Sequence, residues 1–198
     1  MIILPKAIEK TNFSIEEVIA LRRSIREYLN KPLQLKDLAQ ILWAAQGITE
    51  PSLGLRSAPS AGATYPLEVY ILSKNVENLK KGIYKYLPFY HALKVIREGD
   101  YSYDLYQACL YQDWVLNAAA NIIITAIYER TTYRYGTRGI RYVHMEAGHV
   151  GQNIYLQATA LKIGTVAIGA FYDEEVENII QASHQEKVIY IFPLGYKE

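Results

Sequence analysis

The sequence predicts an α+β fold, in which helices and strands are mixed without the regular βαβ alternation of a doubly wound sheet. Segments of strand composition and segments of helical periodicity both recur along the chain. No internal repeat, low-complexity tract or interdomain linker separates them. The chain has 198 residues, a length typical of one domain, so we expect a single domain over residues 1–198.

The first two expected elements are helices, each with a signal at one end. Residues 14–17 (Ser-Ile-Glu-Glu) have the spacing of a capping box, which predicts a short helix through about Arg22. Apolar residues recur at helical spacing over residues 35–45, and Gly47 is expected to end this helix as its C′ residue. Residues 49–63 are rich in Pro, Ser and Gly and predict a long loop.

The remaining expected elements are strands and two further helices. A long helix is expected over residues 139–161 with Gly164 at its end, and Asp173 is expected to cap a short helix through about Gln181. Residues 121–128 form a continuous apolar run, which suits a strand buried on both faces. The other expected strands cover residues 67–72, a hairpin of 83–86 with 93–96, residues 165–168 and residues 188–192.

Composition excludes several classes of protein. The 21 Lys+Arg and 20 Asp+Glu residues give a net charge of +1, which provides no field for nucleic acid or an anionic membrane. The longest uncharged run, residues 114–128, is too short and too polar to span a bilayer. Cys109 is the only cysteine, so an intramolecular disulfide and a multi-cysteine metal site are excluded. With no secretory signal apparent, we expect a soluble cytoplasmic protein.

A cluster of arginines near the N-terminus is the best candidate for holding a phosphate. The glycine-rich fingerprints of dinucleotide-binding folds and P-loops are missing, so side chains must hold any bound phosphate. In an extended segment, Arg22, Ser24 and Arg26 would point to the same side. Guanidinium groups suit phosphate oxygens, and the serine hydroxyl adds a short hydrogen bond. The alternative is a solvated basic helix end, which the helix dipole favours.

Other candidate chemistries have weaker support. His144 and His149 are five positions apart, about 140° around a helix, so one metal ion does not easily bind both. Small residues between them favour instead a helix–helix or subunit contact. Ser60 lies in no nucleophile elbow, and Cys109 has apolar neighbours typical of an inert thiol. The basic, tyrosine-rich residues 128–141 could contact RNA, but the near-zero net charge disfavours this.

Residues 57–66 (Ser-Ala-Pro-Ser-Ala-Gly-Ala-Thr-Tyr-Pro) place small side chains between prolines, directly before a strand. Small side chains let a flat ligand approach the backbone, whose polar groups can then bind ring edges. The alternative is an ordinary turn-rich loop.

Together these segments resemble the nitroreductase-like flavoprotein superfamily, and within it the SagB/ThcOx type of dehydrogenase. The resemblance implies an FMN-dependent oxidoreductase with a nitroreductase-like α+β fold, in which helices flank a central, mainly antiparallel sheet. It also implies a homodimer, with the long helix at the subunit interface. The resemblance covers nearly the whole chain, and its fragments in order are LRRSIREY, LAQILWAAQGIT, SAPSAGATYPLEVYI, YGTRGIRYVHMEAGHVGQNIYLQATALKIGTVAIGAF and IYIFPLGY.

The resemblance also implies which residues bind FMN. The arginine segment would hold the phosphate and ribityl chain, the small-residue loop would run along the ring, and backbone groups after the long helix would meet the ring edge. A basic residue near the C-terminus would join the phosphate site. The implied residues are Arg22, Arg23, Ser24 and Arg26, then Pro59, Ser60, Ala61 and Gly62, then Gly169 and Ala170, and finally Lys197.

The resemblance leaves the substrate open. Hydride would reach flavin N5 from a donor, with NAD(P)H as the candidate, and would leave to a small-molecule substrate in a ping-pong scheme. Azoline dehydrogenases of the family use a Lys-Tyr pair before the long helix. This chain has Arg134 and Tyr135 at that position, so an arginine replaces the lysine. Because arginine stays protonated and is a poor base, a stand-alone reductase or dehydrogenase is favoured. The alternatives are azoline oxidation in peptide maturation and a flavin-binding protein without turnover.

Overall fold

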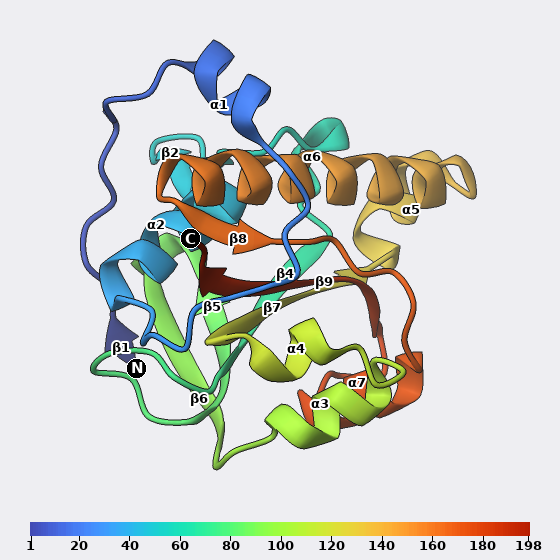
Figure 1. Ribbon diagram of the computed structural model, residues 1–198. Coiled ribbons are helices and arrows are strands. Elements are labelled where there is room, and N and C mark those ends of the chain that lie inside the picture. Colours follow the sequence, from blue (N-terminus) through green and yellow to red (C-terminus); the bar gives the residue numbers. More distant parts are fainter.

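A seven-stranded sheet forms the centre of the protein, and helices cover both of its faces (Figure 1). The computed structural model describes all 198 residues. The strand order is β1-β6-β5-β4-β7-β9-β8, and every neighbouring pair is antiparallel. The strands are β1 (Ile2–Ile3), β4 (Leu67–Ser73), β5 (Gly82–Leu87), β6 (Ala92–Glu98), β7 (Ala120–Ile127), β8 (Ile163–Thr165) and β9 (Glu186–Tyr196). The expected α+β class is therefore confirmed.

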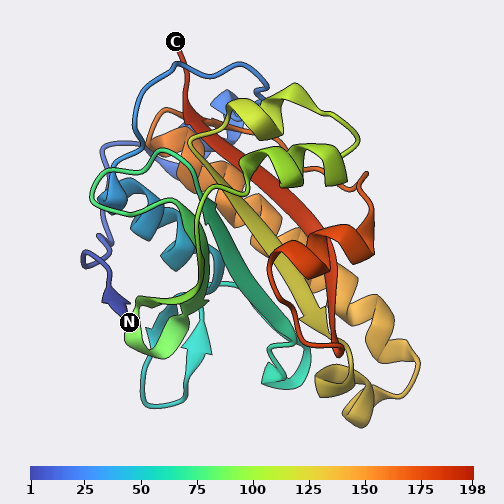
Figure 2. The same ribbon diagram turned by 90° about the horizontal axis from the view of Figure 1, so that it is seen from below.

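Two layers of helices enclose the sheet (Figure 2). Helices α2 (Leu35–Gln46) and α6 (Arg138–Ala160) pack on one face. Helices α3 (Ser102–Ala108), α4 (Asp113–Asn117) and α7 (Asp173–Ile179) lie on the other. Side chains of β4 alternate between the two cores: Val69 and Ile71 belong to the α2/α6 core, whereas Tyr70 and Leu72 belong to the opposite one. No helix has the length and apolar character needed to cross a membrane.

Several expected elements are confirmed with small shifts. Ser14 caps α1 (Ile15–Leu21) with both hydrogen bonds of a capping box. Helix α6 covers nearly the expected residues, and β7 is buried along almost its whole length because it lies between β4 and β9. Helix α7 begins at Asp173 itself, with Tyr172 at the N-cap.

Three expectations were wrong in detail. Gly47 ends α2 with an extended φ of −63°, not as a left-handed C′ residue, and its missing side chain leaves room for the Trp43 ring. The expected loop of residues 49–63 contains a hairpin of β2 (Ile48–Glu50) and β3 (Leu55–Arg56). The strand expected at residues 165–168 is β8, which ends at Thr165, and only a single bridge joins Ile168 to Ile191.

Helices α3, α4 and α5 (Glu129–Tyr135) were not expected from the sequence. Each has only five to seven residues, so its helical periodicity is too short to recognise. Gly136 ends α5 at a φ of 57°, a left-handed conformation that glycine adopts without strain, and α6 begins two residues later. The segment considered for RNA contact is thus the α5–α6 corner.

Candidate functional site

The arginine segment leaves α1 in extended conformation and runs beside the end of the sheet. The Ile25 N–H donates to Thr165 O at 2.9 Å, and the Leu29 N–H donates to Tyr196 O at 2.8 Å. The Ile25 side chain packs against Gly164, where a Cβ atom would lie 2.7 Å from its Cγ2. With alternate side chains facing opposite ways, the neighbours of Ile25 are left to face outward.

Tyr155 of α6 organises the outward side of this segment. Its hydroxyl lies 3.0 Å from Ser24 Oγ and accepts the Ala167 N–H at 2.7 Å. The Arg22 guanidinium lies over the Tyr155 ring, 5.1 Å from its centroid. Arg22 and Ser24 therefore meet at one tyrosine, as the alternation of an extended segment predicts.

The other two arginines differ from each other. Arg26 lies over the Trp114 ring, 5.4 Å from its centroid. Arg23 instead folds back on its own backbone and donates to Ala20 O at 2.9 Å and Arg22 O at 2.7 Å. None of the three arginines forms an ion pair with a carboxylate. Arg22 and Arg26 therefore have free donors, whereas Arg23 uses part of its donor capacity on the chain.

The C-terminal candidates lie near the same segment. Lys197 lines a hollow together with Ile25 and Leu29, so the structure brings it beside the arginine segment. Gly169 and Ala170 are exposed, in the stretch that follows β8. The carbonyl of Ala170 already accepts the Gln112 side-chain amide at 2.8 Å.

The small-residue loop lies against α5 and the middle of α6. Gly62 has a φ of 61°, and a Cβ atom there would lie 2.6 Å from the Tyr135 hydroxyl and 2.8 Å from Arg134 Nη1. Only glycine allows this close approach. Ser60 Oγ accepts the Tyr65 N–H at 2.9 Å, which fixes the direction of its side chain. The fold thus brings Arg134 and Tyr135 to the loop, although about 70 positions separate them in sequence.

Glu146 lies beside this loop and was not predicted from the sequence. It lines a cavity of about 300 Å³ together with Pro59, Ser60, Ala61 and three exposed or partly exposed residues of α6. Its side chain is 2% exposed, and its Oε1 atom has no hydrogen-bond partner. Burial raises the pKa of its carboxyl to about 7, although Ser60, Arg56 and Gln46 lower it in part. The sequence does contain a signal for this residue. Glu146 lies three positions after Val143 and four before Val150, which places a charged side chain on the apolar face of α6.

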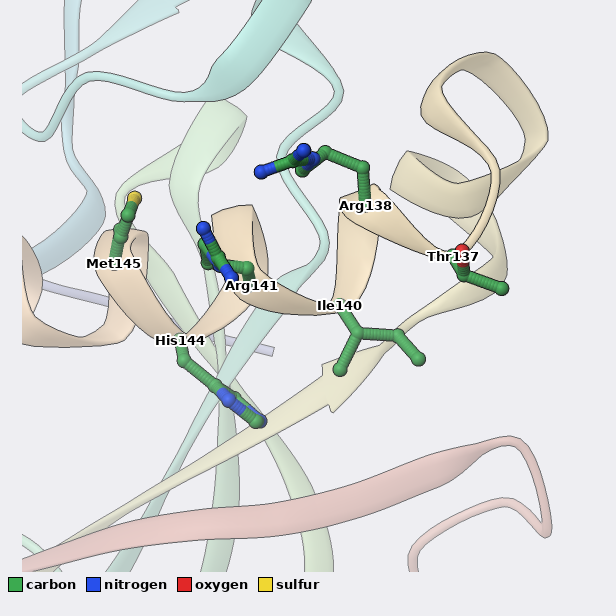
Figure 3. Close-up of a pocket in the computed structure, with 6 residues that line it drawn as sticks. All are labelled: Thr137, Arg138, Ile140, Arg141, His144 and Met145. Atoms are coloured by element: carbon green, nitrogen blue, oxygen red, sulfur yellow. The ribbon is translucent and has the colours of Figure 1, made fainter.

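A larger hollow of about 740 Å³ lies beside the N-terminal part of α6 (Figure 3). Arg138, Arg141 and His144 line it, and Figure 3 shows the two arginines on one side of the helix and His144 on the other; Met145 lines both this hollow and the cavity of Glu146. The His144 Nε2 atom lies 2.6 Å from the Tyr128 hydroxyl. Neither arginine has a carboxylate partner, so the hollow is electropositive.

The two halves of the expected site are separated within one chain. The arginine segment contacts α6 at Tyr155, whereas the small-residue loop meets it at Glu146. Nine positions along a helix correspond to about 13 Å.

The fold is that of a known family of oxidoreductases. Residues 19–196 match the Nitroreductase family, and the chain belongs to it. A Methanocaldococcus jannaschii protein named as a nitroreductase is 46% identical over 183 residues, 92% of this chain and 91% of the relative. The microcin B17-processing protein McbC of Escherichia coli is 29% identical over 150 residues, which cover 73% of this chain and 55% of McbC.

Solved structures support the same assignment. A nitroreductase-named structure from Anabaena variabilis is 32% identical with a TM-score of 0.82, covering 93% of this chain but only 38% of its own. A second nitroreductase-named structure, from Ralstonia eutropha, is 26% identical with a TM-score of 0.88, and the match covers 100% of this chain and 89% of the other. An NADPH:FMN oxidoreductase of Vibrio harveyi shares the fold at 18% identity, with a TM-score of 0.68 and coverage of 93% and 69%.

Proposed function

We propose that the protein is an FMN-dependent oxidoreductase that acts as a homodimer, with residues 1–198 forming one FMN-binding domain. The observation that carries the proposal is the pair of arginines, Arg22 and Arg26, that flank Ser24 without a carboxylate partner. Each guanidinium rests on an aromatic ring, which fixes its plane and leaves its N–H groups for a ligand.

The residues present fit FMN on chemical grounds. A phosphate dianion needs cationic donors, which Arg22, Arg26 and nearby Lys197 supply. A flat ring needs a wall of small side chains to lie against, and Pro59, Ser60 and Ala61 supply one wall of the cavity. Arg23 is the least suited of the implied residues, since its guanidinium is bonded to its own backbone.

When bound, FMN supplies a hydride acceptor at N5, so a donor and a small-molecule acceptor can react in turn by a ping-pong scheme. Tyr135 can hold or donate a proton beside the loop, and Arg134 supplies a fixed positive charge there. The electropositive hollow of Arg138, Arg141 and His144 supports an anionic donor such as NAD(P)H.

A dimer would join the two halves of the site. Helix α6 exposes a stripe that includes Arg141, Met145, Gly148 and Gln152. Gly148 has no atoms within 4 Å of an added Cβ, so a second backbone could approach closely there. A two-fold axis perpendicular to α6 near Gly148 would bring the Tyr155 end of one helix toward the N-terminal half of the other.

Visible absorbance of the purified, desalted protein tests the proposal. We expect a yellow protein that releases about one FMN per subunit. Arg22→Ala is expected to lower FMN retention by at least tenfold, since a charged hydrogen bond contributes about 1.5–3 kcal/mol. Arg23→Ala is the matched control and is expected to retain FMN. A colourless protein that takes up no added FMN would contradict the proposal, and equal occupancy in Arg22→Ala would remove Arg22 from it.

A second candidate is azoline dehydrogenation during peptide maturation, which the similarity to the microcin-processing protein McbC favours. The chain covers about half of that relative, and the resemblance to the family's azoline dehydrogenases implies that Arg134 stands where they have a lysine. Turnover of a thiazoline-containing peptide to the thiazole would establish this activity. A third reading, flavin binding without turnover, predicts bound FMN that NAD(P)H does not reduce.

A further inference from the structure

Glu146 is a buried acidic group at the wall of the proposed ring-binding cavity. It lies on α6 with its side chain 2% exposed, yet it lines the cavity formed with Pro59, Ser60 and Ala61. No hydrogen bond satisfies its Oε1 atom. A structural carboxylate would normally be paired, because an unsatisfied buried charge is costly.

The groups around Glu146 do not neutralise it fully. The charge of Arg56, from β3, lowers the pKa of Glu146 in part, but no ion pair joins the two side chains, and Arg56 Nη1 donates to Gln46 Oε1 at 2.9 Å. Gln46 Nε2 and Arg56 Nε also have no partner. Glu146, Gln46 and Arg56 therefore form a buried polar cluster in which each residue has one atom without a hydrogen-bond partner.

Few other titratable groups share this environment. On α6, Tyr142 and His149 line the same cavity. The pKa of Arg56 is lowered mainly by burial, and the nearby titratable groups Glu68, Arg130 and Tyr65 also act on it.

Ser60 connects Glu146 to the loop. Because Ser60 Oγ accepts the Tyr65 N–H, its hydroxyl hydrogen is free to point elsewhere. Ser60 also stabilises the ionised form of Glu146, so the two side chains interact. Any change of charge at Glu146 therefore acts on the loop that would lie along the ring.

We propose that Glu146 is the proton-holding residue of this active site, which takes up one proton when the bound ring is reduced and releases it on reoxidation. The inference rests on the proposed function. The donor gives a hydride, two electrons and one proton, to the ring, and the ring's added negative charge is balanced when the Glu146 carboxylate binds one proton from solvent. On reoxidation the hydride leaves to the acceptor, and Glu146 returns its proton to water.

The physical reason is the repulsion between two negative charges in a poorly solvated site. Like charges at short range disfavour joint ionisation, so the reduced ring favours neutral Glu146. Glu146 thereby makes reduction easier at low pH and harder at high pH. Tyr142 and His149 stand at the cavity wall, where a proton can enter.

The two-electron potential of the FMN-loaded protein, measured against pH, tests the proposal. Above pH 7 we expect the wild-type potential to fall with pH about twice as steeply as that of Glu146→Gln, because one more proton is taken up per two electrons. His149→Gln is the matched control, which removes the imidazole from the same cavity wall and is expected to keep the wild-type slope. Equal slopes in the wild type and Glu146→Gln overturn the proposal, as does a slope that only His149→Gln reduces.

A second measurement keeps the test independent of how well the variant folds. Infrared difference spectra of the wild type, reduced minus oxidised at pH 8, are expected to show the carbonyl band of a newly protonated carboxylic acid. Absence of that band overturns the inference even if Glu146→Gln does not bind FMN. A wild-type protein without FMN overturns the proposed function first, whereas FMN binding without proton uptake overturns this inference alone.

Discussion

Two buried carboxylates in this protein have pKa values that their surroundings shift in opposite directions. Glu186, 4% exposed, accepts hydrogen bonds from Tyr70 at 2.8 Å, Thr125 at 2.9 Å and Lys85 at 3.1 Å. Burial alone would raise its pKa, but these bonds outweigh burial and lower it. Glu146 has no comparable set of donors, so burial dominates and its pKa rises to about 7. The two residues therefore make opposite contributions to stability as the pH changes.

The first residue-scale prediction concerns Glu146 in the flavin-free protein. The carboxyl ionises near 4.5 when unfolded and near 7 when folded, so its contribution to stability is present below pH 4.5 and is lost as the pH rises through 7. The loss amounts to about 3 kcal/mol. Urea denaturation at pH 5 and pH 8 should show Glu146→Gln gaining stability relative to the wild type at the higher pH. An unchanged difference between the two pH values would show that Glu146 ionises freely in the folded protein.

The second residue-scale prediction has the opposite sign. The pKa of Glu186 is lower in the folded protein than in the unfolded chain, where it is 4.5. Its contribution to stability is therefore fully present above pH 4.5 and is lost as the pH falls through the folded-state pKa. Glu186→Gln should therefore destabilise the protein more at pH 7 than at pH 3.5. The same urea measurements check it, with Glu98→Gln, which removes the exposed partner of Lys80, as a weaker control. Equal destabilisation at both pH values would contradict the assigned charge.

At the scale of elements, the sequence predicted best those segments whose signal is local. The capping box at Ser14, the apolar run of β7 and the long periodicity of α6 each lie within one element. Helix α5 carries no such signal, because it has only seven residues and most of them are polar. Its position depends on packing against α6. The sequence predicted that the small-residue loop contacts a ligand, but the contact of this loop with Arg134 could not be predicted because it arises from tertiary folding.

The junction of α5 and α6 gives a prediction at this scale. A Cβ atom on Gly139 would lie 2.9 Å from backbone atoms of Thr132, and the backbone cannot move aside as a side-chain tip can. Gly139→Ala should therefore cost about 1–3 kcal/mol and displace α5, which carries Tyr135. Ile140→Ala, an exposed neighbour, should change stability by no more than about 0.5 kcal/mol. Thermal or urea denaturation of both variants checks this, and equal stabilities would show that α5 can move freely.

At the scale of the whole molecule, the sequence offered the parts of the proposed site but not the distance between them. The arginine segment and the small-residue loop contact α6 nine positions apart, at Tyr155 and at Glu146. Linear sequence carries no information on which faces of a helix two distant loops reach. Joining the halves across a dimer is the arrangement that the exposed stripe around Gly148 favours.

This arrangement predicts that dimerisation and FMN retention are lost together. Gly148→Arg places a long cation where the second helix would approach, so we expect a monomer in analytical ultracentrifugation and at least a tenfold fall in bound FMN. The folded monomer should remain, because the Cβ of residue 148 meets open space within its own chain. Tyr103→Arg, at an exposed position of α3 on the opposite face of the sheet, is the control and should stay dimeric and yellow. A monomeric Gly148→Arg that keeps its full FMN would show that one chain completes the site, because the cofactor would then span the two contacts on α6 without a partner.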